Sequence, residues 1–131
     1  YGIKVFVARY FQGKGAEAIF VEHPLGGRVY DVVAVDKEYG RVLVEVETLY
    51  GAKVPFRRLK EVIENKYREG FQLWIIIPNP QAVLFVNEIM SVADIFRDKT
   101  IKFFTIDVRE EKLIPLGYIL DTLAISSSYS K

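Results

Sequence analysis

Apolar residues recur along the chain with two different spacings, and these spacings predict its helices and strands. Helical spacing of apolar residues before Gly13 predicts an amphipathic helix over residues 2–12. Alternating and β-branched runs then predict three strands, over 18–22, 28–35 and 41–48. Short glycine-containing turns separate these strands, so we expect an antiparallel three-strand meander.

The second half of the chain alternates helical and strand patterns. We predict helix, strand, helix and strand, at residues 55–70, 72–77, 80–97 and 101–108. The first strand of this half is continuously apolar, which is typical of a strand buried on both faces. The helical region over roughly 80–97 is expected to bend or to be interrupted near Ser91. Two strands joined by a helix of this length predict a right-handed parallel crossover.

The order of these elements predicts an α/β domain with a mixed central sheet flanked by helices. The sheet would combine the antiparallel meander with a parallel strand–helix–strand unit. Because the chain has 131 residues, we expect one domain over 1–125 and a frayed tail over 126–131. The weakly patterned segment up to about residue 125 has room for one more strand or a short helix.

The composition excludes several kinds of active site and metal site. The chain has no cysteine and one histidine, His23, which excludes cysteine nucleophiles, disulfides and multi-histidine metal sites. Any metal would therefore be a hard cation bound by carboxylates. The absence of a long apolar run predicts no membrane span, and we expect a cytoplasmic protein.

The net charge of +1 does not by itself indicate a nucleic-acid partner, but basic residues are unevenly distributed. Residues 1–16 contain three basic residues and no acid, and residues 53–69 contain six basic residues and three acids. Such local excesses are suited to contact phosphates. The other interpretation is that they form solvated helix faces.

An acidic trio stands out from the strand pattern. Alternation places Glu45 and Glu47 on one face of the third strand, roughly 7 Å apart. Asp31 lies in the middle of the preceding strand, where an apolar residue is expected. Partly buried like charges need a positive partner, which is either a divalent cation or a lysine or arginine from the next helix. The other interpretation is a pair of solvated edge-strand glutamates beside an aspartate near a turn.

The segment GRVYDVVAVDKEYGRVLVEVET, which carries this trio, resembles the core of the PD-(D/E)XK, or restriction-endonuclease-like, nucleases. In that family an aspartate ends or interrupts one strand, and a (D/E)-x-K triplet follows on the adjacent strand. Asp31 matches the aspartate and Glu45 the following acid, whereas Glu47 stands where lysine is usual. The predicted element order also agrees with the family's shared core, over about residues 2–108.

The resemblance implies a restriction-endonuclease-like fold and metal-dependent hydrolysis of DNA. Asp31, Glu45 and Glu47 would be catalytic residues and would hold Mg²⁺ or Mn²⁺, which activates water and stabilises the phosphate. The basic residues expected to contact DNA are Arg57, Arg58 and Lys14.

Two departures from the family pattern leave alternatives open. Because Glu47 replaces the usual lysine, we expect a lysine from a neighbouring element to act in its place, either Lys53 or Lys60. The first helix often supplies another acid in this family, but here it has none. Glu17 or Glu22 is the candidate substitute, unless that ligand is absent.

The sequence is compatible with three functions. The leading interpretation is a DNA-cleaving nuclease, alone or as a domain of a DNA-processing protein. Its main rival is a catalytically inactive module of the same fold that binds nucleic acid or dimerises. A third is a protein–protein interaction domain with no nucleic-acid partner. A homodimer is compatible with the leading interpretation, because cleavage of both strands of a duplex needs two sites.

Overall fold

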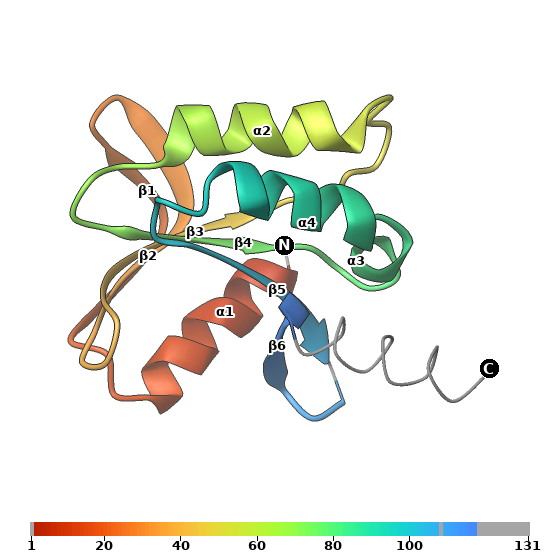
Figure 1. The fold of residues 1–131 in the computed structure, drawn as a ribbon. Helices are drawn as coiled ribbons and strands as arrows, with labels where there is room; N and C mark the ends of the chain where they lie inside the picture. Colours follow the sequence, from red (N-terminus) through yellow and green to blue (C-terminus); the bar gives the residue numbers. More distant parts are fainter. Residues whose placement is uncertain (1, 108, 118–131) are drawn as a thin grey trace.

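The computed structural model describes residues 2–107 and 109–117, which form a mixed six-stranded sheet with helices on both faces (Figure 1). The strands follow chain order across the sheet. They are β1 (Ala18–Leu25), β2 (Arg28–Asp36), β3 (Gly40–Val46), β4 (Gln72–Ile76), β5 (Ile101–Asp107) and β6 (Lys112–Pro115). The predicted tail at 126–131, and the part of the weakly patterned segment from 118 to 125, lie outside the described residues.

The predicted antiparallel meander is confirmed, but its first hairpin is tighter than expected. β1 continues to Leu25, which pairs with Arg28, so the prediction that this strand ends at residue 22 is wrong. Gly26 and Gly27 form the two-residue turn with φ angles of 59° and 81°, which glycine adopts without strain. Pro24 is tolerated inside β1 because β1 is an edge strand, where one N–H is dispensable.

The parallel half of the sheet is also confirmed. α2 (Pro55–Lys66) connects β3 to a parallel β4, and β4 is parallel to β5. β6 lies in the weakly patterned segment, which has room for one more strand, and it is antiparallel to β5. α2 ends at Lys66 and not at Gly70, because Tyr67 has extended backbone with ψ of 137°.

The predicted helical region over 80–97 is interrupted, but the prediction that this happens near Ser91 is wrong. Two helices occupy this segment, α3 (Gln81–Leu84) and α4 (Val86–Ile95), and they meet at Phe85, whose φ of −109° and ψ of 25° depart from helical values. The chain does not bend at Ser91. The Ser91 hydroxyl donates a hydrogen bond to the Asn87 carbonyl, 3.0 Å away, and so is accommodated inside α4.

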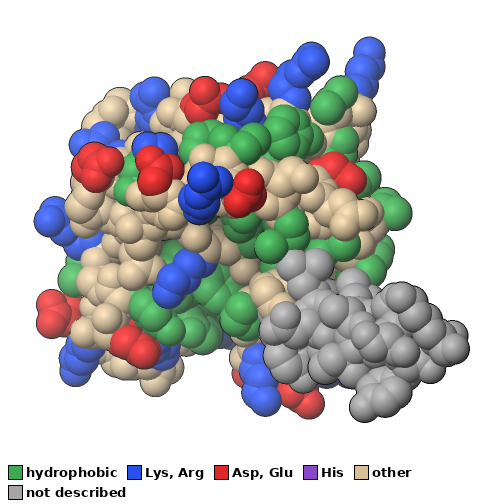
Figure 2. Space-filling view, viewed as in Figure 1, with side chains coloured by type: hydrophobic (Ala, Val, Ile, Leu, Met, Phe, Trp, Pro, Cys, Tyr) green, Lys and Arg blue, Asp and Glu red, His purple; other side chains and the backbone are tan. Residues whose placement is uncertain are grey.

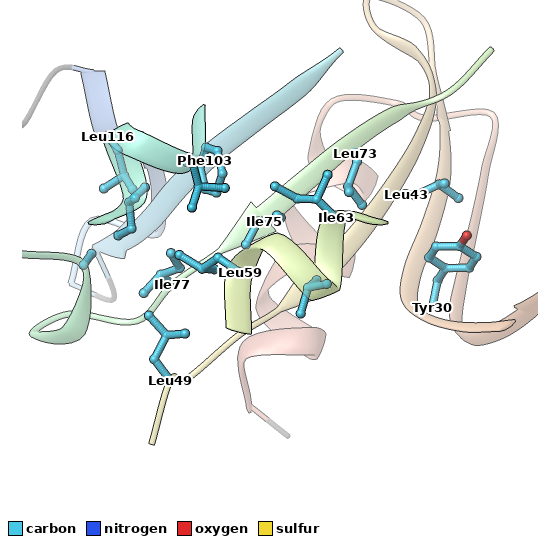
Figure 3. Packing of buried hydrophobic residues seen from close by; sticks show 14 of the residues in the cluster. Tyr30, Leu43, Leu49, Leu59, Ile63, Leu73, Ile75, Ile77, Phe103 and Leu116 are labelled. Atoms are coloured by element: carbon cyan, nitrogen blue, oxygen red, sulfur yellow. The ribbon is translucent and has the colours of Figure 1, made fainter. Parts of the chain in front are cut away.

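Helices on the two faces of the sheet cover separate apolar clusters. α2 and α4 cover one face, where Leu59 and Ile63 pack with Ile75 of β4 (Figure 3). α1 (Gly2–Gly13) covers the other face, where Phe11 lies 5.2 Å from Trp74 between ring centroids. The sheet is therefore buried on both sides in its centre, as the continuous apolar run of β4 predicts.

The outer surface is mixed in character. In Figure 2, lysine, arginine and acidic side chains are interspersed over the upper part of the molecule, where α2 lies, and hydrophobic side chains gather lower, over α1. Within residues 2–107 and 109–117, no helix combines the length and the apolar character needed to cross a membrane.

We predict that Ile63→Ala lowers the free energy of unfolding by about 2–5 kcal/mol, because a fully buried side chain leaves a cavity between α2 and the sheet. Ile95→Ala is the matched control: this isoleucine is also helical but 47% exposed, and its loss should cost less than about 1 kcal/mol. Urea unfolding of both variants measures the difference. Equal losses would contradict the assignment of the α2 face to the core.

Candidate functional site

The pairing of β2 with β3 stops short of Asp31, whereas the pairing of β2 with β1 continues beyond it. In-register pairs with β3 run from Asp36 to Val32; on β1, the pairs Val21–Val32 and His23–Tyr30 flank Asp31 and place Glu22 across from it. Tyr30 and Val33 pack in the same core cluster, although regular alternation would place them on opposite faces. The alternation of β2 is therefore broken around Asp31. Such an irregularity redirects a side chain and ends pairing locally.

Two carboxylates replace the missing backbone hydrogen bonds at this break. The Val46 N–H donates to Asp31 Oδ2 at 2.7 Å, and the Asp31 N–H donates to Glu45 Oε1 at 3.3 Å. Glu45 is buried, with 8% of its surface exposed, and the Asp31 side chain is 20% exposed. The structure thus brings together Asp31 and Glu45, as predicted from the strand pattern.

Two lysines, one from each side of the sheet, contact this acid pair. Lys4 of α1 places Nζ 3.1 Å from Asp31 Oδ1 and 2.9 Å from Glu22 Oε1. Lys66, the last residue of α2, places Nζ 3.3 Å from Glu45 Oε1. Because α1 and α2 cover opposite faces (Figure 1), the pair lies between two ammonium groups. Lys4 also links Glu22 to the site, so Glu22 is the predicted substitute acid that lies near Asp31.

The end of α2 is fixed against the start of β2, and this positions Lys66. The Tyr30 hydroxyl donates to the Lys66 carbonyl at 2.8 Å, and Arg28 Nε donates to the Asn65 carbonyl. The Lys66 ammonium also donates to the Val29 carbonyl and lies 5.0 Å from the centre of the Tyr30 ring. These contacts hold the lysine at the acid pair.

Sequence reasoning missed both lysines, although a signal was present. Lys66 lies three residues after Ile63 and seven after Leu59, which are buried, so it continues the apolar stripe of α2. Lys4 similarly lies three residues before Val7 on the buried stripe of α1. A lysine in register with a buried stripe indicates that its ammonium has a partner near the core.

The charges around the acid pair do not cancel. Three carboxylates, from Asp31, Glu45 and Glu22, face the ammonium groups of Lys4 and Lys66, which leaves one negative charge uncompensated. Burial, together with the negative charge of Asp31, raises the pKa of Glu45 to about 7, and Lys66 only partly opposes this. Hydrogen bonds from Lys4 to Glu22 and Asp31 raise the pKa of Lys4 and keep it charged.

Glu47 is not joined to this pair. Its side chain, 12% exposed, accepts a hydrogen bond from Arg58 Nε at 2.9 Å. Across the described part of the chain, no group of three or more histidine, cysteine or acidic side chains is arranged to hold a metal ion. The predicted three-carboxylate metal site is therefore reduced to two carboxylates. Two are sufficient for Mg²⁺, which commonly binds one or two protein carboxylates and keeps several waters.

Lys53 and Lys60, the predicted substitute lysines, lie elsewhere on the β3–α2 segment. Lys53 is exposed in the loop before α2, and Lys60 is half-buried on the second turn of α2. Neither forms an ion pair with a carboxylate within residues 2–107 and 109–117. Of the lysines in this region, the structure places Lys66 beside Glu45.

Lys14 and Glu17 lie at the opposite end of β2 from Asp31. Lys14 pairs with Glu38 at 2.9 Å and lies 4.2 Å from the centre of the Tyr39 ring. Glu17 donates its backbone N–H to the Val35 carbonyl at 2.8 Å. The rise of a strand puts this end roughly 15 Å from Asp31, so neither residue is near the acid pair.

We predict that Glu45 makes the protein less stable as pH rises. The folded pKa of about 7 lies above the ordinary 4.5, so the contribution of this group is fully present below about pH 4.5 and is lost as pH rises past about 7. The full loss is about 3 kcal/mol. Urea unfolding at about pH 5 and about pH 8 should show this decline in the intact protein and a smaller one in Glu45→Gln. An identical decline in the variant would show that Glu45 is not its source.

Comparisons with known proteins identify no relative of this chain. No family model matches it, and neither a curated protein nor a solved structure matches it. The resemblance to the PD-(D/E)XK nucleases therefore stays a prediction, carried by Asp31, Glu45 and their place on adjacent strands.

Proposed function

We propose that this chain is a metal-dependent nuclease of the restriction-endonuclease-like fold that hydrolyses phosphodiester bonds in DNA. The observation that carries the proposal is the Asp31–Glu45 pair at the break between β2 and β3. Two adjacent carboxylates, one of them buried, share their two lysine partners with a third carboxylate, that of Glu22. This arrangement disfavours a purely structural pair and suits a site that gains a cation.

The residues at the break fit Mg²⁺ or Mn²⁺ chemically. Asp31 and Glu45 supply hard oxygen donors, and together with Glu22 they bring three carboxylates to two ammonium groups when all are ionised. A bound divalent cation would lower the pKa of a coordinated water and stabilise negative charge on the scissile phosphate. Glu45 would then stay ionised at neutral pH, because a nearby cation lowers its raised pKa.

A lysine of α2 brings to the site the positive charge that a lysine at position 47 usually supplies in the family. The Lys66 ammonium, 3.3 Å from Glu45, can stabilise charge that develops on the phosphate as the water oxygen bonds to phosphorus and the ester oxygen leaves. Arg58 neutralises Glu47, the acid at the usual lysine position. Arg58 and its exposed neighbour Arg57 are proposed to hold flanking phosphates of the DNA.

A catalytically inactive binding module is the second candidate, and one observation favours it. Lys4 and Lys66 already contact Asp31 and Glu45, so two ammonium groups partly fill the role that a cation would have. In that case the network would stabilise the break in β2, and the basic residues of α2 would bind DNA without cleaving it. A homodimer remains compatible with either candidate.

Cleavage of supercoiled plasmid and of flap and junction oligonucleotides with Mg²⁺ or Mn²⁺ tests the proposal. We expect metal-dependent cleavage that Asp31→Asn and Glu45→Gln each reduce by at least about 100-fold, because each loses a charged oxygen donor. Lys66→Ala should reduce the rate by roughly 10- to 100-fold, since it removes charge stabilisation. Calorimetric titration of Mn²⁺ should show a site that Asp31→Asn loses.

Glu64→Gln is the matched control, because Glu64 is an exposed acid of α2 with no place in the site. It should cleave like the intact protein. No cleavage by folded protein, with DNA binding retained at low salt, would contradict the nuclease and support the inactive module. Loss of both cleavage and DNA binding would contradict both candidates.

A further inference from the structure

The loop between β3 and α2, residues 47–54, presents an aromatic ring to solvent. Tyr50 is 76% exposed, which is the largest value among the large hydrophobic side chains that the structure describes as exposed. The residue before it, Leu49, is only 4% exposed and belongs to the core cluster beneath α2 (Figure 3). The ring is therefore carried next to an anchored residue.

The backbone of this loop is defined by a turn. Leu49 has a φ of 61° and Gly51 a φ of 71°, and the Ala52 N–H donates to the Leu49 carbonyl at 3.3 Å. Leucine rarely adopts a positive φ, so burial of its side chain must offset the strain. A tyrosine carried on this anchored turn leaves its ring open to a contact outside the folded chain.

Two adjoining hollows lie along this loop, and Tyr50 lines the first of them. One, of about 290 Å³, is lined by residues 47–52 and Arg58. The other, of about 220 Å³, is lined by Lys53, Arg57, Glu61 and neighbouring residues, and it shares Arg58 and Ala52 with the first. The two hollows form a continuous surface from Glu47 to the first turns of α2.

This surface has an excess of positive charge. It contains three cations, Lys53, Arg57 and Arg58, and two acids, Glu47 and Glu61. Arg58 is bound to Glu47, but Lys53 and Arg57 are exposed and have no ion pair in the part of the chain that the structure describes. In Figure 2, blue and green side chains gather at the upper right, where the loop before α2 lies in Figure 1.

The loop is also close to the proposed cleavage site. Glu47 lies two residues after Glu45, or roughly 7 Å along the strand direction. Tyr50 follows three residues later, which adds at most about 10 Å. A nucleotide strand with a phosphate at Asp31 and Glu45 would therefore pass within a few nucleotides of the ring.

We infer that residues 47–54 bind an unpaired segment of DNA beside the scissile phosphate, with Tyr50 stacked on a base and Lys53 and Arg57 on the phosphates. An exposed tyrosine flanked by cations matches how proteins bind single strands without reading sequence. Bases inside a duplex already have both faces stacked and offer none to the ring. The inference rests on the proposed function and narrows its substrate to single-stranded or flap DNA.

Fluorescence of a Tyr50→Trp variant tests this contact directly. The chain has one tryptophan, Trp74, which is 1% exposed and supplies a constant background. A short oligothymidylate should quench the introduced indole, because stacking brings a base against it, and a blunt duplex of equal length should not. Leu84→Trp is the matched control, since Leu84 is 71% exposed on α3, and it should show no quenching.

Binding by the intact protein and by Tyr50→Ala provides the second measurement. Loss of the ring should weaken binding of the oligothymidylate at least about fivefold, and Tyr50→Phe should restore most of it, since the ring face is retained. Replacing Lys53 and Arg57 together by glutamate should weaken binding further and flatten its salt dependence. Equal quenching by duplex and single strand, or full affinity in Tyr50→Ala, would overturn the inference.

The binding assays need no cleavage, which separates this inference from the proposed nuclease activity. Quenching and loss of affinity without cleavage would support the loop as a DNA contact and count against the nuclease. Metal-dependent cleavage would support the nuclease. If Tyr50→Ala kept full affinity and Tyr50→Trp showed no quenching, the role of the loop would be overturned. Cleavage that prefers flaps and depends on Tyr50 would support both.

Discussion

The exchange of backbone hydrogen bonds for carboxylate hydrogen bonds at Asp31 is the constraint on which the site depends. Where β2 and β3 cease to pair, Asp31 accepts the Val46 N–H and Glu45 accepts the Asp31 N–H. Buried N–H groups need acceptors, so the two side chains complete the sheet as well as forming the site. A substitution that removes either carboxylate oxygen therefore disturbs both the strand pairing and the chemistry.

This constraint extends to the helices because two adjacent carboxylates need positive charge. Lys4 reaches Asp31 from α1, and Lys66 reaches Glu45 from α2, although these helices pack on opposite faces. The acid pair thus couples two apolar clusters that the sheet otherwise separates. Burial, together with the negative charge of Asp31, raises the pKa of Glu45, and Lys66 only partly opposes this.

The sequence was sufficient to predict what depends on local pattern. Alternation and turn residues predicted the meander, and the resemblance to the nuclease core predicted that Asp31 and Glu45 would meet on adjacent strands. They did not predict which lysine joins the pair, because that depends on where α2 ends over the sheet. Proximity in sequence favoured Lys53, whereas α2 runs back toward the start of β2 and brings Lys66 to Glu45. The sequence also did not predict that α3 and α4 meet at Phe85, since the apolar spacing continues through this residue.

The two candidate functions differ in which positive charge completes the site. Lys4 contacts Asp31 through Oδ1, while Oδ2 accepts the Val46 N–H, so a cation at Asp31 must share an oxygen with one of these partners. Glu22 offers Lys4 a second carboxylate at 2.9 Å, which allows the ammonium to shift away from Asp31 without losing its ion pair. A lysine held between two acids in this way can neutralise Asp31 in the free protein and yield to a divalent cation when one binds. The presence of Glu22 therefore makes the contact of Lys4 with Asp31 compatible with a metal site.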